Sequence, residues 1–108
     1  MIRTFLDFAV KPGHAEALAA EFERLAILDT SVAQPGCTSA EMSVSADATT
    51  VTVTATWDSP EAYASWTSRG DRGPLADQLN VHLSRPLDAA TVGRVHTVLL
   101  RKEASKPD

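Results

Sequence analysis

The amino-acid sequence predicts an α+β domain in which helices cover one face of a four-stranded antiparallel sheet. The main observation is the order of the hydrophobic patterns along the chain, which is strand, helix, strand, strand, broken helix, strand. The length of 108 residues suits one compact core, and 44% hydrophobic with 22% charged residues is typical of a folded globular domain. We therefore expect a single domain over residues 1–102 and a flexible tail over 103–108.

The first strand is expected over residues 2–10, because β-branched and aromatic side chains dominate this segment and the Lys-Pro-Gly at 11–13 ends it. From His14 to about Ala33, apolar side chains then recur three and four residues apart among charged ones. This spacing predicts one long amphipathic helix, which the Pro-Gly at 35–36 ends.

Residues 37–46 and 50–57 are predicted to form a β-hairpin whose turn is the Asp-Ala-Thr at 47–49. The second strand of the hairpin alternates between threonine and apolar residues, so one of its faces is polar and the other is apolar. The apolar face is made by Val51, Val53, Ala55 and Trp57.

A short helix is predicted over residues 60–68, because Ser59 supplies a capping hydroxyl and a proline occupies the first helical position. A charged, glycine-bearing break over 69–73 separates it from a second helix, which Pro74 opens and Pro86 ends. One side of the second helix is expected to carry Leu75, Leu79, His82 and Leu83.

The last strand is predicted over residues 91–102, and the four strands then have the order of a ferredoxin-like unit. Apolar residues are expected on both faces of the first and last strands, so the face without helices is expected to be an apolar patch. Homodimerisation through that face would cover a patch that soluble monomers rarely expose. The residues concerned are Ile2, Leu6 and Phe8 opposite Phe5, and Val92 and Val98 opposite Val95 and Leu99.

Charge and motif content exclude several functions. The formal net charge of −4 lacks the basic excess that nucleic acids or anionic membranes attract, and no apolar stretch is long enough to span a membrane. Phosphate loops, dinucleotide fingerprints and local metal motifs are missing, so a flavin, a nicotinamide or a structural metal is not expected. The single Cys37 suits a reducing compartment and is expected to pack as a small hydrophobe, which favours a cytoplasmic protein.

Three segments carry a resemblance to a known family, namely FLDFAVKPG at 5–13, PGC at 35–37 and TWDSPEAYASW at 56–66. Over about residues 2–102 the chain resembles the antibiotic biosynthesis monooxygenases, a family of dimeric α+β barrels. The resemblance implies a ferredoxin-like fold and a homodimer. Family members include quinone-forming monooxygenases of polyketide pathways, haem degraders and many proteins of unknown purpose, so the reaction stays open.

For the quinone formers, the resemblance implies an asparagine late in the third strand, a tryptophan at its end, a tyrosine in the short helix and an arginine in the next helix. Trp57 and Tyr63 match this set. Val53 stands in place of the asparagine, and Arg72 or Arg85 would have to supply the arginine from a helix end.

For the haem degraders, the resemblance implies a first-strand asparagine, a tryptophan in the short helix and a ligating histidine in the next helix. Asp7, Trp66 and Leu79 stand at these positions, with His82 almost one turn after Leu79.

Two aromatic side chains and one histidine are the main candidates for a site. Tyr63 and Trp66 lie three residues apart on one helical face, where they either pack in the core or stack against a planar aromatic substrate. His82 is either a buried structural histidine or a general base, since imidazole titrates near neutral pH.

Three further titratable groups are weighed beside them. His96, in the last strand, is the second candidate for the base, and His14 is expected to be exposed. Asp7 either pairs with an arginine such as Arg3 or Arg101 or, if it faces the pocket, takes part in proton transfer.

The sequence therefore predicts a cofactor-independent monooxygenase that uses O2 to oxidise an aromatic, polyketide-like phenol or anthrone to a quinone. His82 is the expected base, Tyr63 the expected oxyanion donor, and Asp7 a third catalytic candidate. The alternatives are a haem-degrading monooxygenase and a non-catalytic dimer that binds a small hydrophobic molecule or supports a neighbouring enzyme. The expected substrate-binding residues are Trp57, Trp66, Val53, Leu79, Phe5, His96 and Arg72.

Overall fold

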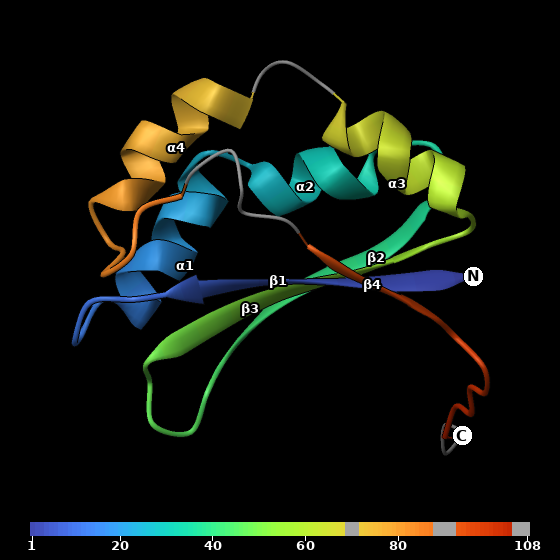
Figure 1. Cartoon of the computed structure of the whole chain (residues 1–108), viewed down its shortest axis with the longest axis horizontal. Coiled ribbons are helices and arrows are strands. Elements are labelled where there is room, and N and C mark those ends of the chain that lie inside the picture. The colour runs from blue at the N-terminus through green and yellow to red at the C-terminus, as the bar shows by residue number, and fades with distance from the viewer. Residues whose placement is uncertain (69–71, 88–92, 105–108) are drawn as a thin grey trace, which may run out of the picture.

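The computed structural model describes residues 1–68, 72–87 and 93–104. They form a four-stranded antiparallel sheet with all helices on one face (Figure 1). The sheet order is β2-β3-β1-β4, which confirms the predicted ferredoxin-like α+β class. The strands are β1 (Ile2–Ala9), β2 (Cys37–Val44), β3 (Thr50–Trp57) and β4 (Arg94–Thr97).

The two central strands, β1 and β3, determine which side chains meet the helices. Ile2 pairs with Trp57 and Phe8 pairs with Val51, and all four side chains are buried on the helix-covered face. Because successive residues of a strand point to opposite faces, the threonines of β3 lie on the other face. The alternation read from the sequence of β3 is confirmed.

The segment after β1 forms two helices, α1 (Ala15–Arg24) and α2 (Ile27–Val32), and the prediction of one helix over 14–33 is wrong. The interruption lies at Ala26, whose φ of 54° is in the left-handed region. An L-residue in this region costs roughly 1–2 kcal/mol, which is why a glycine usually marks such a position. No glycine or proline stands here, so the sequence does not reveal the break.

The short helix α3 (Pro60–Thr67) confirms the start expected from the sequence, because the Ser59 hydroxyl accepts a hydrogen bond from the Ala62 N–H at 3.2 Å. Helix α4 (Arg72–Asn80) begins before Pro74 and ends before His82. Of the side predicted for this helix, Leu79 and Leu83 are buried, whereas His82 lies in the turn that follows α4.

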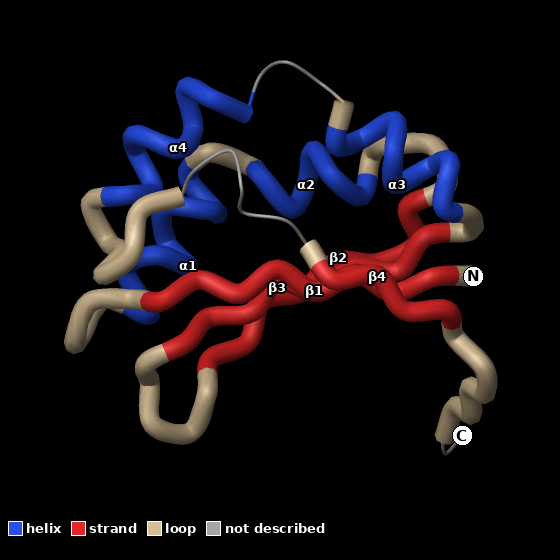
Figure 2. Tube along the Cα trace, in the orientation of Figure 1, coloured by secondary structure: helices blue, strands red, loops and turns tan. Residues whose placement is uncertain are grey.

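Strand β4 is shorter than predicted. It ends at Thr97, which pairs with Ile2, the first residue of β1. Val98 makes one more hydrogen bond, from its N–H to the Met1 carbonyl at 3.1 Å, and beyond it the chain has left its neighbouring strand. The tube in Figure 2 therefore shows residues after β4 as loop, on the side of the sheet away from the helices. Residues 91–92 lie outside the described part of the chain.

Two apolar clusters fill the space between sheet and helices. The larger one, the core cluster, lies under α1 and α4 and contains Phe8, Val10, Leu18, Phe22, Val51, Leu79 and Leu83. The smaller one lies under α3 and contains Ile2, Ala55 and Trp57, with Tyr63 and Trp66 packed against them. We call Trp57, Tyr63 and Trp66 the aromatic cluster.

The face without helices, the open face, is polar, and the predicted apolar patch is wrong. Phe5 is its one large apolar side chain among the described residues, because Val95 pairs with Thr4 on the opposite face and Leu99 follows the end of β4. Val92 lies outside the described residues. The open face consists of Arg3, Phe5, Asp7 and Ala9 of β1, Ser39, Glu41 and Ser43 of β2, Thr50, Thr52, Thr54 and Thr56 of β3, and Arg94 and His96 of β4.

Candidate functional site

The aromatic cluster is assembled where the end of β3 meets α3. Gly36 lets the helix approach, because its φ of 87° lies in the left-handed region and a Cβ atom there would lie 2.6 Å from the Ala62 Cβ. Both the left-handed backbone conformation and the close approach of α3 therefore require a glycine at position 36. With α3 held this close, Tyr63 and Trp66 pack against the end of β3.

Trp57 is the fixed member of the cluster. It is 1% exposed, and its indole N–H donates a hydrogen bond to the Thr4 hydroxyl at 3.3 Å. The Thr4 hydroxyl donates in turn to the Ala55 carbonyl at 3.4 Å, so each polar atom of this buried chain has a partner. The indole is held rigidly enough to serve as a wall for a neighbouring ring.

Tyr63 is the polar member of the cluster. Its ring lies 5.7 Å from the Trp57 ring between centroids, tilted by 57°. Its hydroxyl lies at the start of β4, where a Cβ atom on Gly93 would come within 2.7 Å of it. The side chain is half-buried, and a phenol hydroxyl in this position can donate a hydrogen bond to an oxygen of a bound molecule.

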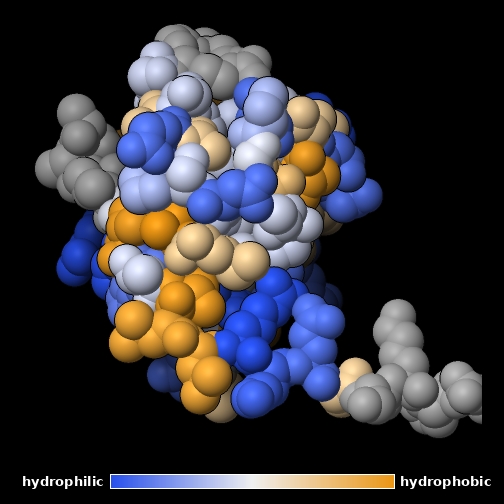
Figure 3. Space-filling model, turned by 90° about the vertical axis from the view of Figure 1, so that its right-hand side faces the viewer, coloured by the Kyte–Doolittle hydropathy of each residue, from blue (hydrophilic) through white to orange (hydrophobic). Residues whose placement is uncertain are grey.

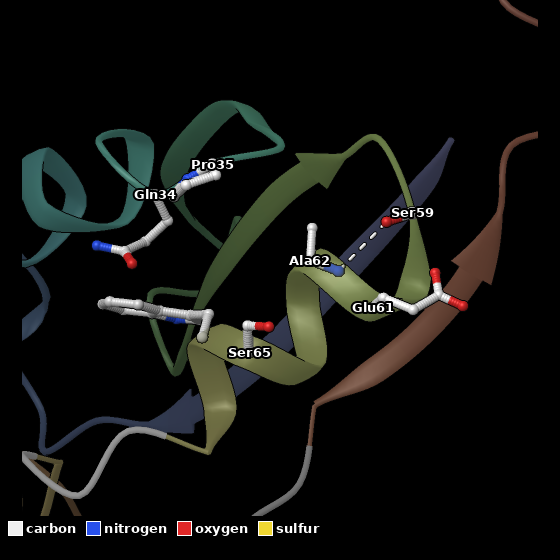
Figure 4. A pocket seen from close by; sticks show the side chains of 7 residues that line it. Gln34, Pro35, Ser59, Glu61, Ala62 and Ser65 are labelled. Carbon is white, nitrogen blue, oxygen red and sulfur yellow. Dashed lines mark hydrogen bonds between the residues drawn. The ribbon is translucent and has the colours of Figure 1, made fainter.

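A hollow of about 330 Å³ opens between the end of α2 and α3, and Figure 4 shows the side chains around it. Trp66 borders the hollow and also packs against the rest of the aromatic cluster, whereas Trp57 and Tyr63 do not line it. An indole flanked by amide and hydroxyl groups suits a planar ring with polar substituents. The hollow is lined by Gln34, Pro35, Ser59, Glu61, Ala62, Ser65 and Trp66.

His82 lies at the other end of the helical layer, against α1. Its Nδ1 atom is 3.2 Å from Nδ1 of His14, so one ring donates the shared proton and the other accepts it. Its Nε2 atom is 3.8 Å from a carboxylate oxygen of Glu21. His14, expected to be exposed, is half-buried in this contact. The structure thus places His82 with His14 and Glu21 and not with the aromatic cluster.

Glu21 carries the charge of this group. A hydrogen bond from Arg24, at 2.6 Å, holds the pKa of Glu21 below its ordinary value. Burial, the second-largest influence, raises this pKa in opposition, and the charges of Arg24 and His82 lower it further. The carboxylate is therefore ionised at neutral pH and available to a protonated His82.

Three of the predicted site residues lie on the open face, behind the sheet from Tyr63. Asp7 accepts hydrogen bonds from Thr52 at 2.6 Å and from Arg94 at 3.2 Å, so its arginine partner is neither Arg3 nor Arg101. His96 packs edge-on against Phe5, with ring centroids 5.1 Å apart. Since side chains on opposite faces of a sheet cannot share one cavity, Asp7, His96 and Phe5 are separated from the aromatic cluster.

The remaining predicted residues are distributed over the helix-covered side. Val53 and Leu79 pack in or against the core cluster. Arg72 is the first residue of α4, but its side chain lies outside the described part, and Arg85 is exposed after α4. Cys37 is half-buried beside the aromatic cluster, with its Sγ atom 3.8 Å from the Ser31 hydroxyl.

Haem does not fit the described residues. The histidine that follows α4, His82, directs both ring nitrogens at protein groups, His14 and Glu21. Trp66, the other residue expected to hold haem, lies on α3 with the smaller cluster. The two residues therefore do not face a common cavity.

Three residues with clear roles at these sites were missed by the sequence analysis. Thr4 was taken as one more strand residue, although a buried indole N–H needs an acceptor. Gly93 carried no motif, and His14 meets His82 only through the fold, 68 residues apart. For Gly93, the one signal that the sequence offered is a glycine inside the strand predicted over 91–102, because a glycine in a strand often marks the close approach of another group.

Within residues 1–68, 72–87 and 93–104, no three or more His, Cys, Asp or Glu side chains are grouped to hold a metal ion. In the same part of the chain, the structure contains no helix with the length and apolarity needed to cross a membrane.

Comparison with known proteins gives a family match and several structural neighbours. The sequence matches the family described as "Antibiotic biosynthesis monooxygenase" over residues 1–72. No curated protein matches the sequence.

Three solved structures illustrate the structural similarity. A variant of SnoaB, a cofactor-independent oxygenase from Streptomyces nogalater, has a TM-score of 0.68 and 17% identity and covers 93% of this chain and 94% of its own. A dimeric ferredoxin-like protein from an uncultured marine organism has a TM-score of 0.73 and 13% identity, with coverages of 96% and 92%. A Mycobacterium tuberculosis protein has a TM-score of 0.64 and 22% identity, with coverages of 96% and 98%. At these identities the likeness establishes the fold.

Proposed function

Since the chain belongs to the antibiotic biosynthesis monooxygenase family, we propose that it is a cofactor-independent monooxygenase acting on an electron-rich aromatic phenol or anthrone. The observation that carries the proposal is the aromatic cluster, in which a rigid indole and a second tryptophan flank a half-buried tyrosine hydroxyl. The likeness to SnoaB, a cofactor-independent oxygenase, supports the same reaction class.

The substrate supplies the electrons in the proposed reaction. Loss of a proton from the ring or its methylene gives a delocalised anion, which passes one electron to O2. The radical and superoxide then combine to a peroxide, and loss of water leaves a carbonyl, so that a CH2 group and O2 become C=O and H2O. The protein lowers the barrier by positioning the ring and by stabilising the anion.

Tyr63 is the proposed donor to the developing oxyanion and Trp66 the proposed wall for the ring, whereas Trp57, expected as a second wall, is 1% exposed and instead packs against Tyr63. The contacts of His82 with His14 and Glu21, and of Asp7 with Arg94, give less support to these two as catalytic groups. A role of His82 and Asp7 in proton transfer is therefore a secondary part of the proposal. The proposed reaction and the role of Tyr63 do not depend on it.

The proposal is tested by oxygen uptake with a panel of anthrones and hydroxynaphthalenes, comparing the native protein with Tyr63→Phe. Removing one oxyanion donor lowers kcat by about 10²–10³-fold in well-studied enzymes, and a fall of at least about tenfold is expected here. His82→Gln, measured in the same assay, tests the secondary role of His82 in proton transfer. Uptake that Tyr63→Phe leaves unchanged would contradict the assignment of Tyr63.

A non-catalytic binding protein is the second candidate. It is favoured by the lack of a carboxylate or histidine in the described part of the smaller cluster, where the ionisable side chains are those of Tyr63 and Cys37. Such a protein would quench its tryptophan fluorescence on binding an anthrone but would consume no O2. The same panel therefore separates the two functions.

We also propose a homodimer that forms through the open face. Arg3 and Arg94 alternate there with Asp7 and Glu41, a pattern that is self-complementary under two-fold symmetry. The structural likeness to a dimeric ferredoxin-like protein supports a homodimer. In this form each protomer keeps its own aromatic cluster on the helix-covered face.

A further inference from the structure

Two histidines meet at the end of the molecule where β1 leads into α1. We call His14 and His82 the histidine pair. In Figure 1 the end of β1, the start of α1 and the turn after α4 lie together at the left. Figure 3 looks at the opposite end, where β1 begins, and shows apolar side chains gathered in its lower part. The aromatic cluster lies toward that opposite end, so the histidine pair is separate from the site of the proposed reaction.

The two imidazole rings of the pair face each other. The Nδ1 atoms are 3.2 Å apart, and the ring centroids are 5.5 Å apart. Two nitrogens that bind one zinc ion tetrahedrally, each about 2.0–2.1 Å from the metal, lie about 3.3 Å from each other. The Nδ1 atoms are therefore already spaced like two ligands of one metal ion, and a pivot of the rings directs both lone pairs at it.

The carboxylate behind His82 determines which of its ring nitrogens carries the proton. Glu21 is ionised, and its Oε1 atom lies 3.8 Å from Nε2 of His82. Because a carboxylate attracts an N–H group and repels a lone pair, the proton of neutral His82 stays on Nε2. The lone pair of Nδ1 then points toward His14. Metal-binding histidines usually direct their second ring N–H at a carboxylate or carbonyl in this way.

The backbone holds both histidines of the pair in place. The Lys11 N–H donates to the His82 carbonyl at 3.0 Å, and the Lys11 carbonyl accepts from the His14 N–H at 2.9 Å. The next residue along β1, Val10, forms a β-bridge with Leu83, and both side chains are buried in the core cluster. Ligands fixed in this way lose little conformational freedom when they bind an ion.

We propose that the histidine pair binds a divalent transition metal ion such as Zn²⁺ through Nδ1 of His14 and Nδ1 of His82. Imidazole is a good ligand of Zn²⁺, Cu²⁺ and Ni²⁺, whereas Mg²⁺ and Ca²⁺ prefer oxygen ligands. Among the described residues no third His, Cys, Asp or Glu side chain completes a metal-binding group here, so water fills the other positions. The bound ion ties the start of α1 to the turn after α4.

Isothermal titration calorimetry with ZnCl2 tests the proposal, on protein that carries no histidine tag and has been freed of metal with a chelator. We expect one Zn²⁺ to bind per chain. The dissociation constant should rise at least about tenfold in His14→Gln and in His82→Gln, because each variant removes one of the two nitrogen ligands. His96→Gln is the matched control, since His96 lies on the open face against Phe5, and it should bind Zn²⁺ like the native protein.

NMR of the histidine rings locates the ion in the native protein, even where a variant loses its fold. The chain has three histidines, and His96→Gln identifies the signals of His96. ZnCl2 should shift the ring signals of His14 and His82 and leave those of His96 in place. MgCl2 at the same concentration should shift none of them, because imidazole is a poor ligand of Mg²⁺.

Each result supports or overturns the metal site. Weaker binding in both pair variants, with shifts confined to the pair, supports it. A native protein that binds no Zn²⁺, or an affinity that either pair variant leaves unchanged, overturns it, and the pair is then a hydrogen bond between α1 and the turn after α4. The oxygen-uptake assay with Tyr63→Phe decides the proposed reaction separately, because that reaction does not depend on the histidine pair.

Discussion

Tyr63 and Gly93 form the contact on which the geometry of the aromatic cluster depends most directly. A Cβ atom on Gly93 would lie 2.7 Å from the tyrosine hydroxyl but 3.8 Å from the ring carbon that carries it. The distance to the hydroxyl oxygen is too short for a van der Waals contact, and the distance to the ring carbon is an ordinary one. An alanine at this position should therefore push the hydroxyl away, and the ring, to which the oxygen is rigidly bonded, should tilt with it.

This difference predicts a non-additive pair of substitutions. Gly93→Ala should lower the free energy of unfolding by about 1 kcal/mol, the lower end of the usual cost of overpacking, because the clashing atom is the tip of a side chain. In a Tyr63→Phe background the same substitution should cost almost nothing, since the clashing oxygen is absent. Urea denaturation of the four proteins measures the coupling.

Equal costs of Gly93→Ala in both backgrounds would contradict this placement of the hydroxyl. The turnover number provides a second test of this placement, because Gly93→Ala moves the Tyr63 hydroxyl without removing it. If Tyr63 acts as proposed, Gly93→Ala should lower kcat, and it should have no further effect in the Tyr63→Phe protein.

The residues of the candidate site could be read from the sequence only where their chemistry is local. Tyr63 and Trp66 were recognised because three-residue spacing on a helix places them on one face, and this needs no tertiary information. Thr4 and Gly93 were not recognised, since their roles come from contacts with Trp57 and Tyr63, far away in the chain. The separation of Asp7 from the cluster follows from strand alternation, which the sequence contained but which its apolar neighbours obscured.

At the scale of elements, strands and helices with a regular side-chain pattern or a clear start signal were predictable from the sequence. The places where a helix is interrupted or a strand ends were not. The threonine alternation fixed both faces of β3, and a proline and a serine fixed the start of α3. The break between α1 and α2 depends on Ala26 taking a conformation that its type does not favour. The end of β4 depends on where β1 begins, which is a property of the sheet and not of the β4 sequence.

The contact between α1 and the turn after α4 predicts a defined pH dependence. Because the pKa of Glu21 is lowered from 4.5 in the folded protein, its ionised form contributes stability above pH 4.5. This contribution is lost as the pH falls through the lower folded-state value. Glu21→Gln should therefore be less stable than the native protein near neutral pH, and the two stability curves should converge below pH 4.5.

Urea denaturation between about pH 7 and pH 3 measures this convergence. Asp47→Asn is the matched comparison, because hydrogen bonds from Ser45 and Thr49 also lower the pKa of Asp47, but in the β2–β3 turn. Parallel curves for native protein and Glu21→Gln over the whole range would contradict the role given to Glu21.

At the scale of the whole molecule, the character of the open face changes what kind of dimer the chain can form. The sequence predicts an interface between two apolar sheet faces, but the open face carries the ion pairs Arg3–Glu41 and Arg94–Asp7, each at 3.2 Å. The guanidinium groups of Arg3 and Arg94 also lie over the Phe5 ring, at 5.8 Å and 5.2 Å from its centroid. In the proposed homodimer, association through this face therefore depends on charges.

This dependence on charge yields the last prediction. Charge contacts at a partly exposed interface weaken as the screening length falls from about 10 Å at 0.1 M to about 3 Å at 1 M. The dimer dissociation constant should therefore rise with NaCl in the native protein. It should rise with a smaller slope in Arg94→Gln, which removes one charge from the open face. Sedimentation equilibrium across this salt range measures the slopes, and a native dimer that is indifferent to salt would mean that another surface holds the protomers together.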